Sequence, residues 1–144
     1  MALFKKRPDT FSITMQLVEA HARGDANTVA AARDALSRVS TLEILQCVFR
    51  FGQMVGGKLK PEDKEVIRRA YASVTGPPEI QRAVNAIGVA CFVVAQQDAV
   101  TTAVNTYMAP LLDSPADAVR RVVLEIVAAT GQACGQLEMK FNWK

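Results

Sequence analysis

The stretch IQRAVNAIGVACFVV, residues 80–94, decides the fold class of this chain. Many of its apolar residues recur at helical spacing and form one stripe. The stripe consists of Ile80, Val84, Ile87, Cys91 and Val94. Val89, Phe92 and Val93 add apolar side chains on the other sides of the same helix. A helix that is apolar nearly all round needs cover on most sides, so we expect it to lie at the centre of a helical bundle.

Helix start and stop signals divide the chain into about seven segments. The later starts are marked by Asp25, by Ser40 with Glu43 as a capping box, by Pro61, by Pro77 with Pro78, by Asp98, and by Ser114 with Pro115. The short connections predict an all-α protein, a compact bundle of six or seven helices in one domain. The sequence leaves open whether the fifth and sixth helices are continuous. Gly131 and Gly135 are expected to loosen the end of the last helix.

The end of the sequence alternates apolar and polar residues. Leu137, Met139, Phe141 and Trp143 are the apolar members of this pattern. Period-two alternation is typical of a half-buried β-strand, so we predict a strand-like tail over residues 136–144 with these four side chains as partner-binding residues. A lone strand needs another edge to pair with. That edge is residues 10–14 of the same chain, the same tail in a second copy, or another protein.

Pairing of the C-terminal tail with residues 10–14 of the same chain would make a small two-stranded sheet from the termini. It depends on residues 10–16, which fit two patterns. They alternate as a strand would, but Phe11, Met15 and Val18 also share one helical face. We favour a helix from about Ser12, after a short basic segment at residues 1–9.

Composition sets limits on the function. The chain has 144 residues, 50% of them hydrophobic and 22% charged, and a net charge of +3. This is the composition of one globular domain, and the charge is too small to indicate nucleic acid or an anionic membrane as a partner. The longest nearly apolar run, residues 83–95, is shorter than the roughly 20 residues that span a bilayer. No apolar segment follows the basic residues near the start, so we expect a cytoplasmic protein without a membrane span.

Residues suited to catalysis or metal binding are few. The three cysteines, Cys47, Cys91 and Cys134, are far apart, which argues against disulfides and zinc sites. The one histidine, His21, has no nucleophile signature near it, and no glycine-rich phosphate loop is present. Glu125 is the one acid within the apolar run of the last helix, where it can pair with Arg121. We therefore expect no enzyme, no metal site and no cofactor.

One segment superficially resembles the helix-turn-helix of sigma-factor region 4. The resemblance rests on Leu59, Pro61, Glu62, Asp63, Glu65, Val66, Ile67, Arg69, Tyr71, Glu79, Ile80, Gly88 and Val89. It implies DNA binding, and the phosphate contacts would be Lys5, Lys6, Arg7, Arg120 and Arg121. The helix that would enter the major groove reads ACFVVA, residues 90–95, whereas base recognition uses polar side chains.

These observations favour a non-enzymatic protein-protein interaction or regulatory protein, of the adaptor kind. We expect it to self-associate as a homo-oligomer through its helical surface and its C-terminal strand. The alternative is a small DNA-binding regulator that uses residues 61–97. The third class is an enzyme with an unrecognised carboxylate site.

Overall fold

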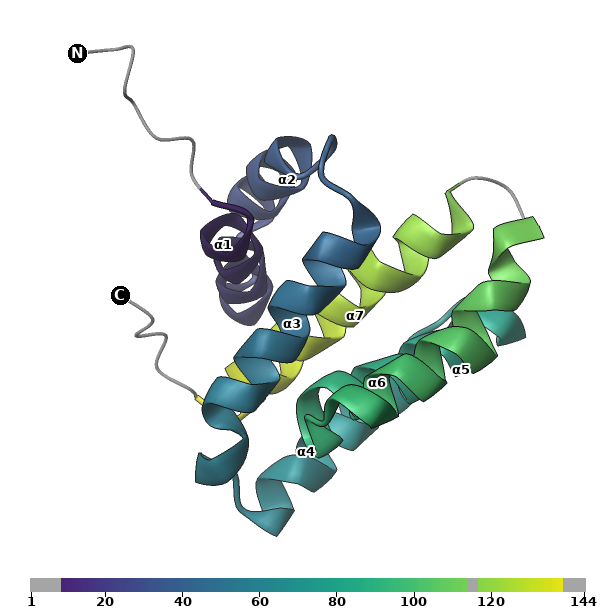
Figure 1. Ribbon diagram of the computed structural model, residues 1–144. Coiled ribbons are helices and arrows are strands. Elements are labelled where there is room, and N and C mark those ends of the chain that lie inside the picture. The colour runs from purple at the N-terminus through teal and green to yellow at the C-terminus, as the bar shows by residue number, and fades with distance from the viewer. Residues whose placement is uncertain (1–8, 114–116, 139–144) are drawn as a thin grey trace.

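The computed structural model describes residues 9–113 and 117–138, and these residues form seven α-helices with short π- and 3₁₀-helical extensions (Figure 1). The α-helices are α1 (Thr10–Arg23), α2 (Ala26–Ala35), α3 (Thr41–Val55), α4 (Pro61–Ala72), α5 (Pro78–Gly88), α6 (Gln97–Ala103) and α7 (Ala118–Gln136). The extensions are η2 (Gly56–Lys58), η3 (Val89–Val94), η4 (Val104–Met108) and η5 (Ala109–Asp113). The predicted all-α fold is confirmed.

The predicted two-stranded sheet is not supported, because residues 10–14 are the first turns of α1. The carboxylate of Asp9 caps this helix and accepts a hydrogen bond from the Ser12 backbone N–H at 2.7 Å. Helix formation buries Met15 and Val18 on one face, whereas a strand would have separated them. No residue of the described ranges is in a strand.

Helix α7 runs through the middle of the molecule, with α1 and α2 on one side and α4, α5 and α6 on the other (Figure 1). It packs against α1, α3, α4 and α5. Its buried residues are Val122, Val123, Ile126, Val127, Ala129, Thr130, Gly131, Ala133 and Cys134. One hydrophobic core cluster draws residues from all seven α-helices.

The fifth helix is only partly the central helix that we expected. Ile87, Cys91 and Phe92 are fully buried, but Val89 is half-buried and Val94 is 44% exposed. One side of α5 and η3 therefore faces outward. The helix also ends before the sixth begins, because Ala95 has a left-handed backbone (φ 53°) and Gln96 is extended.

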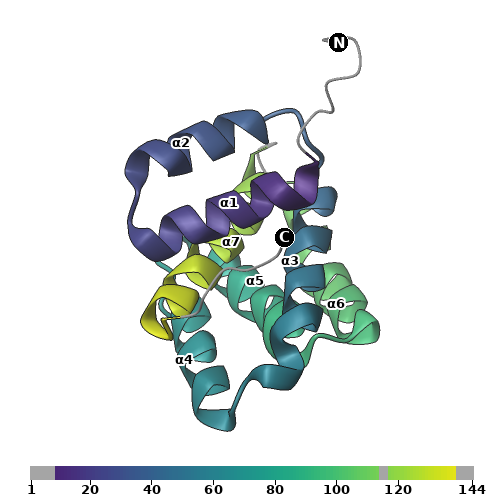
Figure 2. The same cartoon turned by 90° about the vertical axis from the view of Figure 1, so that its left-hand side faces the viewer.

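Gly131 and Gly135 do not loosen the last helix, since α7 continues through both. They are the places where α1 lies against its backbone (Figure 2). A Cβ atom at Gly131 would lie 2.5 Å from the Val18 carbonyl oxygen, and one at Gly135 would lie 2.6 Å from that of Ala22. The glycines thus permit close packing of two helices instead of ending one.

Candidate protein-protein interface

The first residues of the predicted C-terminal strand belong to the end of a helix. Gln136 is the last residue of α7, and Leu137 has a helical backbone and donates its N–H to the Ala133 carbonyl at 3.0 Å. The Leu137 side chain is half-buried against the core. The predicted strand is therefore wrong at residues 136 and 137. Met139, Phe141 and Trp143 lie outside the described residues.

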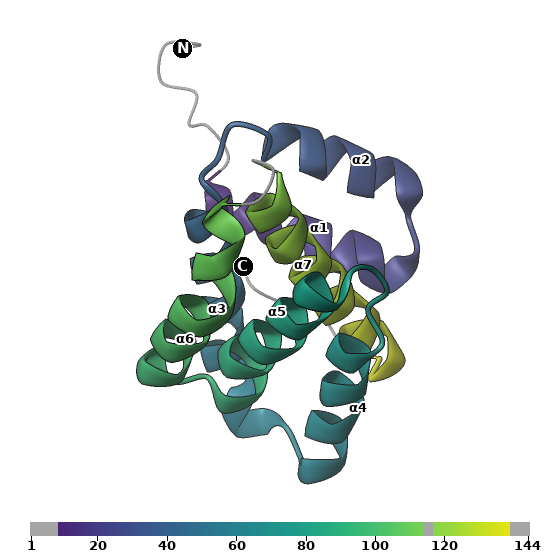
Figure 3. The same cartoon turned by 90° about the vertical axis from the view of Figure 1, so that its right-hand side faces the viewer.

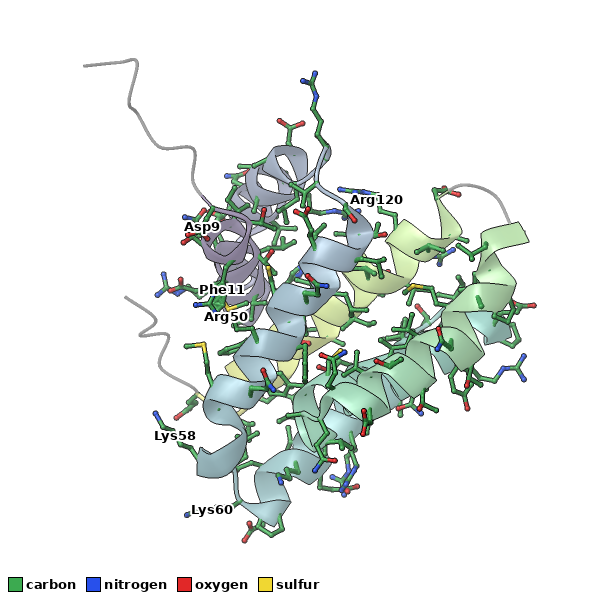
Figure 4. All side chains as sticks on the ribbon, viewed as in Figure 1. Asp9, Phe11, Arg50, Lys58, Lys60 and Arg120 are labelled. Atoms are coloured by element: carbon green, nitrogen blue, oxygen red, sulfur yellow. The ribbon has the colours of Figure 1, made fainter. Side chains whose placement is uncertain are left out.

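Of the five predicted phosphate contacts, the described residues include Arg120 and Arg121. Lys5, Lys6 and Arg7 lie outside the described residues. Arg120 extends from α7 to the connection between α2 and α3, where its guanidinium donates to the carbonyls of Leu36 at 2.8 Å and Val39 at 3.3 Å (Figure 4). A guanidinium can donate to carbonyls at the end of a helix, so Arg120 ties the end of α2 to α7.

Arg121 is exposed, and its guanidinium lies beside Gly76 in the connection between α4 and α5. The two neighbouring arginines therefore reach in different directions. In the segment that resembles a helix-turn-helix, Cys91, Phe92 and Val93 are buried in the core.

The cysteines are free thiols in the described part of the chain. Burial raises the pKa of Cys91 and of Cys134 to about 12 each, and it also raises the pKa of the half-buried Cys47 thiol. Such thiols are protonated and unreactive at neutral pH. Within the described ranges, no group of three or more His, Cys, Asp or Glu side chains is placed to hold a metal ion.

The most distinctive surface lies on α5, η3, α6 and η4, which stand side by side in Figure 3. Between them is an open depression of about 540 Å³. It is lined by Ala86, Val89, Ala90, Val94, Asp98, Ala99, Thr102, Ala103, Thr106 and Tyr107. We call this surface the α5–α6 face. Val94 and Tyr107 expose 44% and 38% of their surface here, and Asp98 is its one charged residue.

A second, smaller groove lies on the other side of α6. It has a volume of about 270 Å³ and lies between α3 and α6. Its apolar lining residues are Leu42, Leu45, Phe49, Val100 and Val104, and Leu42 is 51% exposed. Amides of Gln46, Gln97 and Asn105 surround it without a charged side chain. Helix α6 is thus flanked by two grooves whose lining residues include one charged side chain, that of Asp98.

Sequence reasoning missed the α5–α6 face, although the sequence carries a signal for it. Of the 31 charged residues, only Asp98 lies within residues 83–112, a stretch of 30 residues. The apolar character of residues 83–95 predicts a buried helix, but it does not indicate which side of that helix stays exposed. A helix apolar on the outside as well as the inside is a sign of an interaction surface.

Comparison with known proteins adds no family to this description. No protein-family model matches the chain, and no curated protein or solved structure is significantly similar to it. Among the helices described by the structure, none is both long enough and apolar enough to cross a membrane.

Proposed function

We propose that this chain is a non-enzymatic protein-protein interaction protein that self-associates through the α5–α6 face. The observation that carries the proposal is the low charge of an exposed two-helix surface, where Asp98 is the one charged residue. Interface centres are depleted in charged residues relative to the remaining surface of a protein. Residues 83–112 show this depletion, and part of the segment is exposed.

The shape of the α5–α6 face supports the same proposal. The depression is shallow and apolar, and Val94 and Tyr107 leave apolar surface exposed around it. Thr102 and Thr106 add small polar side chains that pack closely without a desolvated charge. An aromatic side chain beside a shallow apolar hollow is a common anchor in interfaces.

A second copy of the chain is the partner that fits best. The face carries no charged cluster that would select a partner of opposite sign. Two copies of this face, each with the single charge of Asp98, are compatible when a two-fold axis relates them, because each Tyr107 then meets the same apolar surface on the other copy. In the proposed homodimer, α6 lies near the two-fold axis.

The test is the solution mass by light scattering, at several concentrations, for the native sequence and for Thr102→Arg. Thr102 is exposed and lines the depression, so an arginine there is accommodated by the monomer but places a long charged side chain between the two copies of a dimer. We expect the native chain to be a dimer and Thr102→Arg to weaken dimerisation at least about tenfold. Thr75→Arg is the matched control, because Thr75 is exposed in the connection between α4 and α5.

A chain that ends at Glu138 distinguishes the face from the C-terminal residues that we predicted to bind a partner. If the face holds the dimer, this shortened chain still dimerises. A native chain that is monomeric at all concentrations contradicts the proposal. So does a dimer that Thr102→Arg leaves intact and the shortening abolishes, because the residues after Glu138 would then carry the interaction.

A further inference from the structure

A cleft formed by α1, α2 and α7 has a different chemistry from the α5–α6 face. It lies between α2 and α7 with α1 as its floor, and its volume is about 490 Å³. The lining consists of Leu17 and His21 from α1, Arg33 from α2, Asp117 at the start of α7, and Arg120, Arg121, Leu124, Glu125 and Ala128 from α7. Helix α2 packs mainly on α1 at the edge of the molecule (Figure 2).

The charged side chains of the cleft do not pair with one another. The three ion pairs of the described residues join Arg23 with Glu19, and Arg68 and Arg69 with Glu65. None of these residues lines the cleft. Five charged side chains therefore border one concave space without an ion pair among them.

The arginine side chains give the cleft hydrogen-bond donors and a net positive charge. Arg120 uses two of its N–H groups on the carbonyls of Leu36 and Val39, and a guanidinium has five. Arg33 is exposed at the rim, while Arg121 reaches along the other rim toward Gly76. The three arginines outnumber the two carboxylates, Asp117 and Glu125, so the cleft has a surplus of positive charge.

We propose that this cleft binds a small organic oxyanion that also carries hydroxyl groups. Its volume lies in the range of about 300–1,000 Å³ that is usual for small-molecule sites. Arginine recognises carboxylate and phosphate oxygens with directed hydrogen bonds. Glu125 and Asp117 accept hydrogen bonds from the hydroxyls, and the half-buried Leu124 and Ala128 contact the carbon skeleton. The shared chemistry is an oxyanion with hydroxyl groups, which a phosphate ester and a hydroxy acid both supply.

The NMR signals of the His21 ring can report the binding of an anion in the cleft. It is the single histidine of the chain, so its ring gives one set of NMR signals. Burial, and then the positive charge of Arg33, lowers its pKa below the ordinary value of 6.5. An anion bound beside Arg33 offsets that positive charge, and the pKa of His21 then rises.

The experiment uses the full chain and two probes, glycerol 3-phosphate and malate, at constant ionic strength. Binding is followed by calorimetry and by the His21 ring signals. We expect saturable binding of at least one probe with a dissociation constant of about 1 mM or tighter, together with a raised His21 pKa. Binding of glycerol 3-phosphate alone identifies phosphate esters as the ligand class, and binding of malate alone identifies hydroxy acids.

Arg33→Gln tests the site directly, because Arg33 has no ion pair within the described residues and its loss should leave the fold intact. Arg38→Gln is the matched control, since Arg38 is exposed nearby in the connection between α2 and α3 but does not line the cleft. We expect Arg33→Gln to weaken binding about tenfold and Arg38→Gln to change it less than about twofold. Failure of both probes to saturate up to about 10 mM overturns the proposal. Equal losses in the two variants also overturn it, because they would show attraction by net charge alone.

Discussion

Tyr71 and Thr130 form a buried link between two helices at the scale of single residues. The Thr130 hydroxyl donates to the Ile126 carbonyl at 2.7 Å, so the Tyr71 hydroxyl donates to Thr130 across 2.5 Å. Burial raises the pKa of Tyr71 well above its ordinary value of 10, and the hydroxyl therefore remains a donor at all moderate pH values. This hydrogen bond joins α4 to α7 in the core.

Tyr71→Phe removes this donor and keeps the ring. We expect it to lower the free energy of unfolding by about 1–2 kcal/mol, because Thr130 then loses a buried partner. Tyr107→Phe is the matched control, since Tyr107 is partly exposed, and it should change stability by less than about 0.5 kcal/mol. Urea denaturation at one low protein concentration measures the free energy of unfolding of both variants and of the native chain. Equal effects would contradict the importance of the buried link.

His21 is the residue whose charge responds to moderate pH. Its pKa in the folded protein lies below the ordinary value of 6.5, first because of burial and second because of Arg33. His21 therefore takes up a proton at a higher pH in the unfolded chain than in the folded one. As the pH falls from about 6.5 toward the pKa of the folded state, this difference lowers the free energy of unfolding.

Arg33→Gln should raise the His21 pKa toward its ordinary value, because it removes the nearby positive charge. The NMR titration of the His21 ring in the native chain and in Arg33→Gln measures the change without added ligand. Arg38→Gln should leave the midpoint nearly unchanged. A midpoint that does not move in Arg33→Gln would show that burial alone lowers the pKa.

Most helices could be predicted at the scale of elements, because their start signals act locally. Asp25 caps α2 through the Thr28 backbone N–H, and Pro61 begins α4, where Asp63 accepts a hydrogen bond from the Lys60 backbone N–H at 3.0 Å. The predicted capping box at Ser40 does not form, since the Ser40 side chain makes no capping hydrogen bond. Helix α3 begins there all the same, and its core contacts Ile44 and Leu45 are buried.

The glycines could not be interpreted from the sequence, because their role depends on which helix packs against them. Gly52 shows this most clearly. A Cβ atom there would lie 2.2 Å from the Cys91 carbonyl oxygen, so α3 and η3 approach each other backbone to backbone. A Cβ atom at Gly56 would have the Ala95 Cβ as its nearest neighbour, at 4.0 Å. The backbone of Gly56 is helical, so an alanine fits there without strain.

Two alanine substitutions should therefore have opposite signs. Gly52→Ala forces a backbone shift and should destabilise the fold by about 1–3 kcal/mol, at the upper end because backbone atoms move less readily than side chains. Gly56→Ala should be neutral or stabilise by up to about 1 kcal/mol, because alanine restricts the unfolded chain more than glycine does. Thermal unfolding compares the two, and similar effects would contradict the close approach of α3 and η3.

At the scale of the whole molecule, the distribution of charge is the property most closely related to function. One end of the fold holds the charged cleft between α2 and α7, and α5 and α6 carry a surface with one charged residue. The lack of charge over residues 83–112 was visible in the sequence, but its exposed part was not. Periodicity shows that side chains share a face, whereas only packing decides which face stays uncovered. The cleft was hidden for a similar reason, since its residues come from three separate helices.

The central claim is that the α5–α6 face holds two copies together. This is tested most directly by comparing amide hydrogen exchange in a dilute and in a concentrated sample of the protein. Exchange slows where a surface becomes buried. We predict that concentration slows exchange in residues 94–108, around Val94, Thr102 and Tyr107, and leaves α2 unchanged. Slowing confined to other segments, or no dependence on concentration, would contradict the account.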